Sequence, residues 1–205
     1  MTDRSSSAHW NQRYATADYY YGTEPNDFLR EQAHRIRPSG SVLCLAEGEG
    51  RNAVFLAAQG HDVVALDSSS AGLAKAECLA RERAVIIQTV LADLTAYPLG
   101  TGTWDGVVSI WCHLPADARR ALHRDVVAAL RPGGVFLLES YTPAQLALKT
   151  GGPQTADLLP RLDALREELD GLSFDIAIER EREIHEGRGH NGRSAVVQIL
   201  ATKPL

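Results

Sequence analysis

Short apolar runs alternate with longer stretches of helical periodicity through the middle of the chain. Each run has the length of a buried strand, and each longer stretch repeats its apolar residues at helical spacing. The predicted strands span residues 41–46, 61–66, 85–90, 104–110 and 135–140. The predicted helices that follow them span residues 51–59, about 68–83 and about 115–130. Strands that alternate with helices in this way indicate an α/β fold with a parallel sheet and right-handed crossovers.

The pattern changes after residue 140. Residues 141–155 are rich in Thr, Gly and Pro, which predicts a loop in a position to act as a lid. A helix is predicted over residues 157–169, followed by two strands over residues 172–184 and 194–202. The connection between these two strands is short, so they are expected to pair antiparallel. If the first of them runs parallel to the sheet, the loop of residues 185–193 overhangs the carboxyl ends of the strands.

The segment before the sheet is predicted to be mostly helical. Helices are expected over residues 9–15 and 27–36, and the aromatic segment of residues 19–26 joins them. That segment is either a hydrophobic plug over the sheet or a flap that closes on a ligand. The expected organisation is a polar, disordered N-terminus (residues 1–8) and a single domain (residues 9–205) whose first part (residues 9–40) is an N-terminal helical cap.

The first predicted strand runs into a glycine-rich turn that carries the strongest functional signal in the chain. Glu47, Gly48, Glu49 and Gly50 stand between the apolar strand and the helix that begins at Arg51. Glycines have no Cβ, so a ligand can approach their backbone closely. The start of the helix adds unpaired N–H groups and a partial positive charge. A strand, a glycine turn and a helix in this order are typical of a nucleotide-cofactor site.

Two cofactors fit such a turn. Gly48, Gly50 and Ala53 match the G-x-G-x-x-G/A pattern of dinucleotide binders, and Asp67 lies at the distance of a ribose acid. A pyrophosphate at this turn would meet Glu47 and the acid between the two glycines, with little water to screen the repulsion. S-adenosylmethionine (SAM) carries an ammonium and a sulfonium and no phosphate, so the two acids favour SAM. A turn that merely connects strand and helix is the third alternative.

Polar side chains also follow the ends of the other predicted strands. Glu47, Asp67, Asp93 and His113 each come soon after a strand ends. In a parallel sheet the carboxyl ends of the strands share one edge, and ligands of such folds bind beyond that edge. We therefore expect these four side chains to lie on one rim.

The loop of residues 185–193 is rich in histidine and arginine. Its predicted overhang places these side chains near the reacting atoms. A histidine can take a proton from a nucleophile, and an arginine can stabilise an anion. The predicted catalytic residues are His113, His185, Arg188, His190 and Arg193.

Composition and charge narrow the class of protein. The chain has 205 residues, 44% of them hydrophobic, and a formal net charge of −5. This composition predicts a globular domain, and the acidic charge argues against nucleic acid as a partner. No apolar run approaches the length of a membrane span, and no secretory signal is recognisable. The three cysteines are widely spaced, so we expect a cytoplasmic protein with no disulfide framework and no metal site.

Taken together, these residues resemble the class I SAM-dependent methyltransferases over nearly the whole chain. Glu47-Gly48-Glu49-Gly50 looks like the first motif of the family, and residues 130–134 are similar to its turn before the fifth strand. The resemblance implies a Rossmann-like α/β fold with a seven-stranded, mostly parallel sheet whose last strand is reversed. Asn52 departs from the family pattern, because many members have a third glycine at this position.

The resemblance also implies the cofactor and its contacts. Asp67 matches the acid that binds the ribose hydroxyls of SAM, and Asp93 matches the acid near the adenine amino group. Glu47 is expected to receive the ammonium of SAM. Arg51 stands at a helix N-terminus, where a cation is disfavoured, so we expect an acid or an anionic ligand to hold it. The predicted cofactor-binding residues are Tyr21, Glu47, Gly48, Glu49, Gly50, Arg51, Asn52, Asp67, Ser68, Ala92, Asp93, Leu94 and Ile110.

A narrower resemblance is to bacterial tellurite-resistance methyltransferases and related thiol and thiopurine S-methyltransferases. The segments that carry it are residues 10–14, 21–26, 48–52 and 113–115. In the tellurite enzymes a histidine and arginines near the last hairpin are thought to hold the oxyanion. His185 and Arg193 look like the matching positions, whereas Glu186 stands where a second arginine is expected.

These observations predict methyl transfer from SAM to a small, soft nucleophile: a thiol, or a selenium or tellurium oxyanion. The expected product of the cofactor is S-adenosyl-L-homocysteine (SAH). The alternatives are O- or N-methyl transfer to a small metabolite, a SAM-binding module without catalysis, and a dinucleotide oxidoreductase. The expected partner is a small-molecule substrate, with no nucleic acid and no membrane, and the protein is expected to be a monomer or a homodimer.

Overall fold

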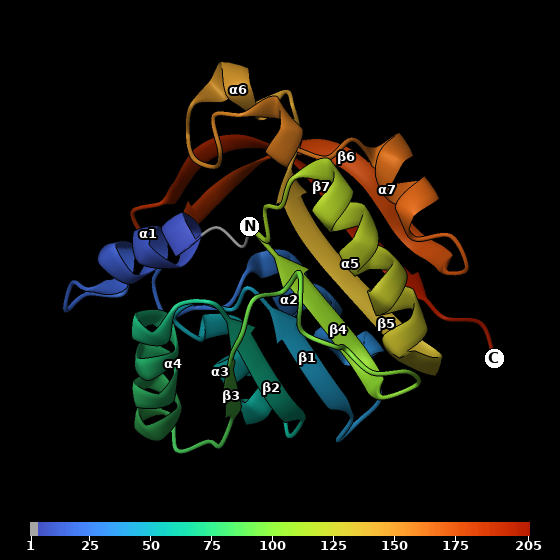
Figure 1. Ribbon diagram of the computed structural model, residues 1–205, viewed down its shortest axis with the longest axis horizontal. Helices are drawn as coiled ribbons and strands as arrows, with labels where there is room; N and C mark the ends of the chain where they lie inside the picture. Colours follow the sequence, from blue (N-terminus) through green and yellow to red (C-terminus); the bar gives the residue numbers. More distant parts are fainter. Residues whose placement is uncertain (1–3) are drawn as a thin grey trace.

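A seven-stranded sheet forms the centre of the computed structural model, which describes residues 4–205 (Figure 1). The strands are β1 (Ser41–Leu45), β2 (Asp62–Asp67), β3 (Gln88–Leu91), β4 (Trp104–Ile110), β5 (Leu130–Tyr141), β6 (Ser173–Glu186) and β7 (His190–Thr202). Their order across the sheet is β3-β2-β1-β4-β5-β7-β6. The strands β1 to β5 pair in parallel, whereas β7 runs antiparallel to β5 and β6. The predicted sheet with one reversed strand is therefore confirmed.

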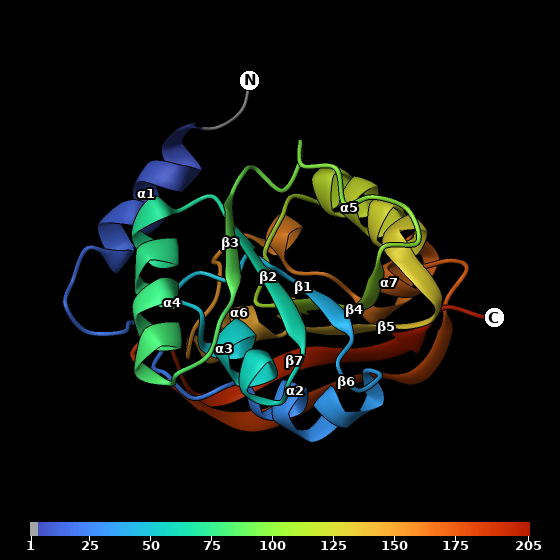
Figure 2. The same cartoon turned by 90° about the horizontal axis from the view of Figure 1, so that it is seen from below.

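Helices cover both faces of the sheet (Figure 2). The helices α5 (Ala116–Ala129) and α7 (Leu162–Glu168) pack on one face through apolar residues such as Val126. The helices α2 (Asp27–Gln32) and α3 (Arg51–Ala58) pack on the other face through residues such as Leu56. The other helices are α1 (Arg4–Tyr14), α4 (Ser70–Glu82), α6 (Gln145–Leu148) and the short 3-10 helices η1 (Ala33–Arg35) and η2 (Ala156–Leu158). Because the central strands are covered on both faces, their sequences are continuous apolar runs.

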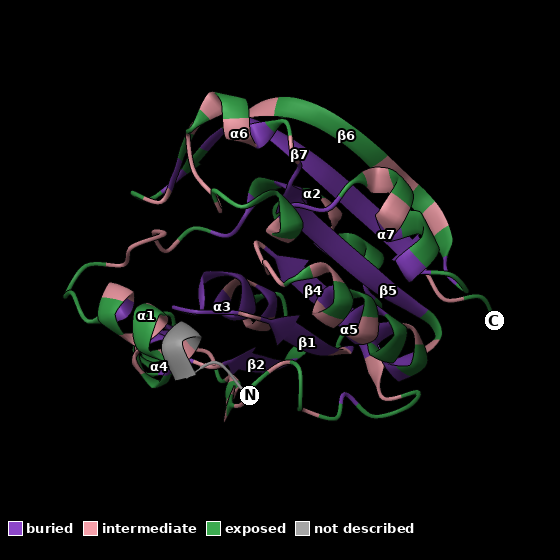
Figure 3. Cartoon of the chain, turned by 45° about the horizontal axis from the view of Figure 1, so that its top comes forward, coloured by how far each residue is buried: buried purple, intermediate pink, exposed green. Residues whose placement is uncertain are grey.

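The outer strand β6 differs from the central strands. Figure 3 shows β5 and β7 buried along most of their length and β6 exposed along its outer edge. Burial returns at the end of β6, where Ile184 and Glu186 are covered. The turn between β6 and β7 therefore folds back against the rest of the protein at the carboxyl edge of the sheet.

The N-terminal helix begins earlier than the sequence predicts. We expected disorder up to residue 8 and a helix from residue 9, whereas α1 begins at Arg4; residues 1–3 lie outside the described residues. Contacts with the start of α4 account for the difference. The hydroxyl of Ser7 donates to the carbonyl of Ser68, and Oδ1 of Asn11 accepts from the backbone N–H of Ala71. Tertiary packing thus stabilises a polar segment that has little helical signal of its own.

Three further segments differ in detail from their prediction. The helix expected over residues 27–36 is α2 followed by η1, and the helix expected over residues 157–169 is η2 followed by α7. The loop expected over residues 141–155 contains the single turn α6. No helix within residues 4–205 is long and apolar enough to cross a membrane.

Candidate active site

The glycine turn after β1 is bent by two glycines in the left-handed region. Gly48 has a φ of 61° and Gly50 a φ of 90°, which side chains with a Cβ rarely adopt. A Cβ on Gly50 would collide with Ala76 of α4, so this glycine lets α3 and α4 approach each other. A Cβ on Gly48 would lie 2.7 Å from the hydroxyl of Tyr14. Side chains of the protein therefore make the close approaches that we expected from a ligand: Ala76 at Gly50 and Tyr14 at Gly48.

Glu47 caps the helix that follows the turn. Its Oε1 accepts from the backbone N–H groups of Asn52 at 2.9 Å and of Ala53 at 2.8 Å. The side chain is buried, and burial raises its pKa from 4.5 to about 7 against the lowering effect of these hydrogen bonds. No described basic side chain lies within 4 Å of the carboxylate. Glu47 is thus a buried acid that a cationic ligand would stabilise in its charged form.

Asp67 at the end of β2 is the second buried acid beside the turn. Its Oδ2 accepts from the backbone N–H of Gly48 at 2.8 Å, and its Oδ1 accepts from that of Ser69 at 2.7 Å. Burial raises its pKa as well. Among the residues that the structure describes, no lysine, arginine or histidine forms an ion pair with it. Asp67 therefore joins β2 to the glycine turn and leaves its charge without a basic partner.

Glu49 holds the aromatic segment. Its Oε2 accepts from the backbone N–H of Tyr20 at 2.8 Å and of Tyr21 at 3.3 Å, and its Oε1 pairs with Lys75 at 2.7 Å. The residue is buried. The carboxylate that we expected to face the cofactor is thus engaged with the segment of residues 19–26 and with α4.

Arg51 is held by an acid, as one of our two alternatives expected. Its guanidinium pairs with Glu186 at the end of β6, and both side chains are buried. The amide of Asn26 also donates to Glu186, at 2.8 Å, and Oδ1 of Asn52 accepts from the backbone N–H of Asn26 at 3.0 Å. Asn52, where a third glycine is common in the family, therefore positions the start of α2. The side chains of Arg51 and Asn52 are thus both engaged by other residues of the protein.

Five rings form a stacked group at the carboxyl edge of the sheet, which we call the aromatic cluster: Tyr21, Trp111, His113, Tyr141 and His190. The His190 ring lies between Tyr21 and Trp111, with centroids 4.6 Å and 4.8 Å away. Trp111 stacks on Tyr141 at 4.4 Å, and His113 is parallel to Tyr141 at 5.8 Å. The hydroxyl of Tyr141 lies 2.7 Å from Nδ1 of His190. The cluster brings together residues from β5, β7, the loop after β4 and the aromatic segment.

Both histidines of the aromatic cluster are neutral near pH 7. Burial lowers the pKa of His113 to about 4, and burial with the nearby charge of Arg51 lowers that of His190 well below its ordinary value. Nε2 of His113 is buried and has no hydrogen-bond partner among the described atoms. A neutral imidazole with a free nitrogen can accept a proton from a bound group.

The cluster lies close to the glycine turn. The ring of Tyr14, whose hydroxyl faces Gly48, has its centroid 6.4 Å from that of Tyr21. On the other side, the indole N–H of Trp111 donates to Glu186 at 2.7 Å, and Glu186 pairs with Arg51 at the start of α3. A cofactor over the turn would therefore have the aromatic cluster as its neighbour.

The other histidine and arginines of the β6–β7 turn do not join the cluster. His185 is exposed and its Nδ1 lies 2.9 Å from Oδ1 of Asn191, and Arg193 is exposed and pairs with Glu181. Arg188 is exposed at the tip of the turn. Side chains of a strand alternate between its two faces, so the face that buries Glu186 and His190 cannot also carry His185 and Arg193. The expectation that all four side chains converge on the chemistry is wrong in geometry: only His190 turns inward.

The remaining predicted cofactor residues lie along the same edge. The backbone N–H of Ala92 donates to the carbonyl of Asp67. Asp93 is exposed, and its Oδ1 accepts from the N–H and hydroxyl of Thr95. Ser68 and Leu94 are half-buried, and Ile110 is buried.

Sequence reasoning missed four residues that the structure places in the site. Tyr14 lies against the turn, Trp111 and Tyr141 belong to the aromatic cluster, and Glu186 joins the cluster to α3. Trp111 directly follows β4 and Tyr141 is the last residue of β5. The rule that strand ends share a rim could have identified these two. Tyr14 and Glu186 stand in segments that carry the family resemblance, but the sequence does not indicate their roles.

Comparison with known proteins finds a family match over the first part of the domain. Residues 42–134 match the family model described as a methyltransferase domain. The chain is 26% identical over 133 residues to the 2-heptyl-1-hydroxyquinolin-4(1H)-one methyltransferase of Mycobacteroides abscessus, a match that covers 63% of this chain and 59% of that protein. The chain spans about half the length of the curated relatives it matches, between 43% and 59%.

Solved structures extend the similarity to the whole fold. A structure described as "Conversion of a Disulfide Bond into a Thioacetal Group during Echinomycin Biosynthesis" has a TM-score of 0.77 and 18% identity, over 97% of this chain and 92% of that one. TehB from Haemophilus influenzae has a TM-score of 0.72 and 21% identity, over 96% of this chain and 66% of that one. The N-methyltransferase NodS from Bradyrhizobium japonicum WM9, in complex with SAH, has a TM-score of 0.70 and 15% identity, over 98% of this chain and 99% of that one.

The fold and the matched domain define a class I SAM-dependent methyltransferase fold, as predicted. SAM is the cofactor of this class, and the acids beside the turn fit it. Glu47 and Asp67 are buried and have no described basic partner within 4 Å, which suits a cation and disfavours a diphosphate. Within residues 4–205, no group of three His, Cys, Asp or Glu side chains is placed to hold a metal ion.

Proposed function

We propose that the protein transfers a methyl group from SAM to a small, soft nucleophile: a thiol, or a selenium or tellurium oxyanion. The observation that carries the proposal is His190, buried and neutral between Tyr21 and Trp111 at the edge of the sheet. SAM supplies an electrophilic methyl group on a sulfonium and leaves as SAH. Residues Glu47 and Asp67 would hold its charged and hydroxyl groups.

The aromatic cluster provides the environment for the acceptor. Its rings exclude water, and a desolvated thiolate is a strong nucleophile. A thiol acceptor must lose its S–H proton as its sulfur lone pair forms the new S–CH3 bond. The neutral ring of His113 or of His190 can take this proton, and the adjacent thiolate raises the pKa of the imidazole that receives it. Alignment of the acceptor by the stacked rings contributes several kcal/mol by proximity.

A second candidate is O-methyl transfer to a flat aromatic acceptor. The rings of Tyr21, Trp111 and Tyr141 are stacked in a way that suits an aromatic substrate. A curated relative is a hydroxyquinolone methyltransferase. In contrast, the description of the echinomycin structure names a disulfide and a thioacetal, which supports a sulfur acceptor.

A panel of acceptors tests the two candidates. Methyl-labelled SAM is incubated with the protein and with thiols, selenite, tellurite, phenols, hydroxyquinolones or amines, and the methylated products are separated. We expect label on thiols or on the selenium and tellurium oxyanions. Label on phenols or hydroxyquinolones alone would replace the first candidate by the second.

Variants of one histidine connect the activity to the cluster. His190→Ala is expected to lower kcat/KM by roughly a hundredfold, the usual contribution of a positioned proton acceptor. The matched control is His34→Ala, because His34 is exposed in η1, before β1. Equal activities of the two variants would exclude His190 as the proton acceptor.

A further inference from the structure

The aromatic segment is held at its centre by one ion pair whose acid is buried. Oε2 of Glu49 accepts from the backbone N–H groups of Tyr20 and Tyr21, at 2.8 Å and 3.3 Å. Oε1 of Glu49 pairs with Nζ of Lys75 at 2.7 Å, and that ammonium also donates to the carbonyl of Asp18 at 2.7 Å. The pair thus satisfies two backbone donors and one backbone acceptor of this part of the chain, and we call it the Glu49–Lys75 clasp.

Both partners of the clasp are fixed to the glycine turn. Glu49 stands between Gly48 and Gly50, so its backbone is part of the turn itself. A Cβ on Gly50 would collide with Ala76, which directly follows Lys75 on α4, so this part of α4 packs on the turn. The turn, α4 and the clasp therefore form one packed unit. A ligand that fixes the backbone of the turn also fixes the base of the Glu49 side chain.

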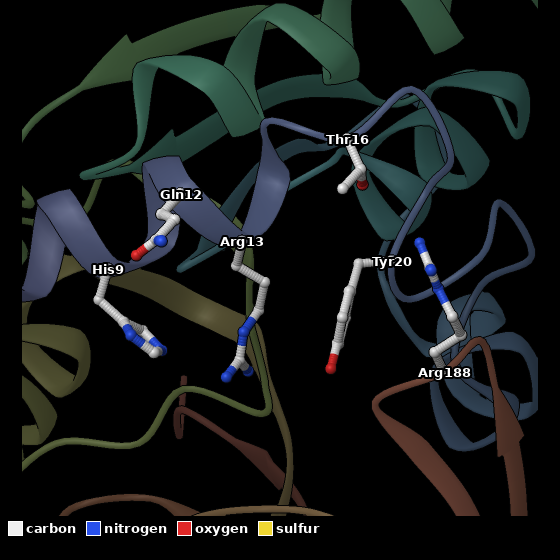
Figure 4. Close-up of a pocket in the computed structure, with 6 residues that line it drawn as sticks. All are labelled: His9, Gln12, Arg13, Thr16, Tyr20 and Arg188. Atoms are coloured by element: carbon white, nitrogen blue, oxygen red, sulfur yellow. The ribbon is translucent and has the colours of Figure 1, made fainter.

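The ring of Tyr20 borders an open depression, where its other contacts are weaker. The depression has a volume of about 330 Å³ and lies between α1, the aromatic segment and the β6–β7 turn. Figure 4 shows Arg13 and Arg188 on either side of the Tyr20 ring, and their guanidinium groups lie 5.1 Å and 5.5 Å from its centroid. Cation–π contacts at such an open site are weaker than charge-assisted hydrogen bonds to a buried acid, so the clasp is the stronger attachment of this residue.

The position of the aromatic segment decides where rings of the aromatic cluster lie. The ring of Tyr21 stacks on His190, with the two centroids 4.6 Å apart. The β6–β7 turn that leads into His190 packs on the same segment, because a Cβ on Gly189 would collide with the rings of Tyr20 and Tyr21. A displaced segment would therefore separate Tyr21 from His190 at the site proposed for the acceptor.

We propose that Glu49 is a positioning residue for methyl transfer, whose clasp with Lys75 couples cofactor binding at the glycine turn to assembly of the acceptor site in the aromatic cluster. The inference rests on the proposed function, because that function assigns the acceptor to the cluster. A cofactor that orders the turn orders Glu49, which holds Tyr20 and Tyr21 in place. By thermodynamic linkage, the acceptor binds more tightly to the protein that carries the cofactor, and the cofactor binds more tightly when the acceptor is present.

Hydrogen exchange of the aromatic segment tests the clasp without any turnover. Amide exchange of residues 16–26 is measured by mass spectrometry in the wild type and in Glu49→Ala, each with and without saturating SAH. In the wild type we expect SAH to slow exchange at Tyr20 and Tyr21 by roughly tenfold, the value of one charge-assisted hydrogen bond. In Glu49→Ala we expect fast exchange that SAH no longer slows, with the central strands still protected.

A conservative variant keeps the test available if Glu49→Ala does not fold. Glu49→Gln preserves the size of the side chain and an oxygen for the two N–H groups, but it loses the charge and the pairing with Lys75. We expect an intermediate slowing of exchange by SAH. An effect of SAH that is equal in the wild type and in the folded variants would overturn the inference.

Steady-state kinetics measure the consequence for the reaction. With labelled SAM and 2-mercaptoethanol, Glu49→Ala is expected to raise the KM for the thiol by roughly tenfold and to lower kcat, while the KM for SAM changes much less. Glu49→Gln should restore part of the loss. Glu167→Ala, which removes a carboxylate from an exposed position on α7, is the matched control and should behave as the wild type. A raised KM for SAM with an unchanged KM for the thiol would assign Glu49 to the cofactor and overturn its positioning role.

The two measurements separate this inference from the proposed function. Slowing of exchange by SAH that depends on Glu49 supports the clasp even if no thiol is methylated, in which case only the proposed acceptor fails. Methylation of the thiol with equal kinetic constants in the wild type and Glu49→Ala would leave the proposed function intact and overturn the positioning role.

Discussion

Replacement of Glu47 by glutamine is expected to raise the stability of the fold at neutral pH and to lower the affinity for the cofactor. Oε1 of Glu47 accepts two backbone N–H groups at the start of α3, and a glutamine oxygen can accept both. Burial raises the pKa of the carboxyl from 4.5 to about 7, so its charge destabilises the unliganded protein. This rise corresponds to roughly 3 kcal/mol of unfolding free energy.

The sign of the pH dependence follows from the folded protein holding the Glu47 proton more tightly than the unfolded chain. The stability of the wild type therefore declines as the pH rises from 4.5 through about 7 and levels off above it. Glu47→Gln lacks this decline. We expect the variant to equal the wild type near pH 4.5 and to exceed it by up to roughly 3 kcal/mol at pH 8.

The same substitution is expected to weaken cofactor binding. A buried carboxylate that receives an ammonium contributes roughly 1.5–3 kcal/mol, so Kd for SAH should rise by about tenfold to a hundredfold. Urea titrations between pH 4.5 and 8 measure the stability, and calorimetry with SAH measures the affinity. Glu183→Gln, at an exposed position on β6, is the matched control. The reasoning would be refuted if the variant bound SAH as tightly as the wild type and its stability changed with pH in the same way. Glu47 would then be only a helix cap.

Three other substitutions have defined outcomes. Gly50→Ala should lower the unfolding free energy by about 2 kcal/mol or more, because its Cβ would collide with Ala76 and its φ is 90°; an unshifted urea midpoint would contradict this. Glu168→Gln should cost about 3 kcal/mol while leaving kcat unchanged, because Glu168 is buried in its ion pair with Arg119. Burial would raise the pKa of Glu168, but its hydrogen bonds lower it to about 2. The stability that this carboxylate contributes above pH 4.5 is therefore lost as the pH falls toward 2, and acid titration of the wild type measures this loss. Asp67→Asn should raise Kd for SAH by roughly tenfold or more in calorimetry, because the amide cannot accept from both backbone N–H groups; unchanged binding would remove Asp67 from the cofactor site.

The predicted arrangement of strands and helices agrees closely with the structure, because local patterns encode it. The strand expected over residues 104–110 is β4 without change, and the helix expected over residues 51–59 is α3 one residue shorter. The antiparallel pairing of the last two strands followed from their short connection, and the reversal of the final strand followed from the family resemblance. The rim of polar residues followed from the parallel sheet, since strand ends converge wherever such a sheet forms.

The orientation of single side chains required the tertiary structure. His185 and His190 stand on one turn, yet the register that pairs Glu186 with His190 buries these two and exposes His185. Glu49 was predicted to face the cofactor, but Lys75 and the aromatic segment provide closer partners. Such choices depend on which charges and rings arrive from distant segments, and no local pattern contains that information.

The sequence by itself determined the class of fold, the glycine turn and the edge at which we expect a cofactor, because periodicity and strand order follow from hydrophobic burial along the chain. The tertiary structure alone decided that Tyr14 lies against Gly48 and that His190 is buried between Tyr21 and Trp111. The physical reason is that a side chain turns toward the neighbours that satisfy its charge and cover its apolar surface. Those neighbours are chosen only when the sheet, α1 and the β6–β7 turn pack together.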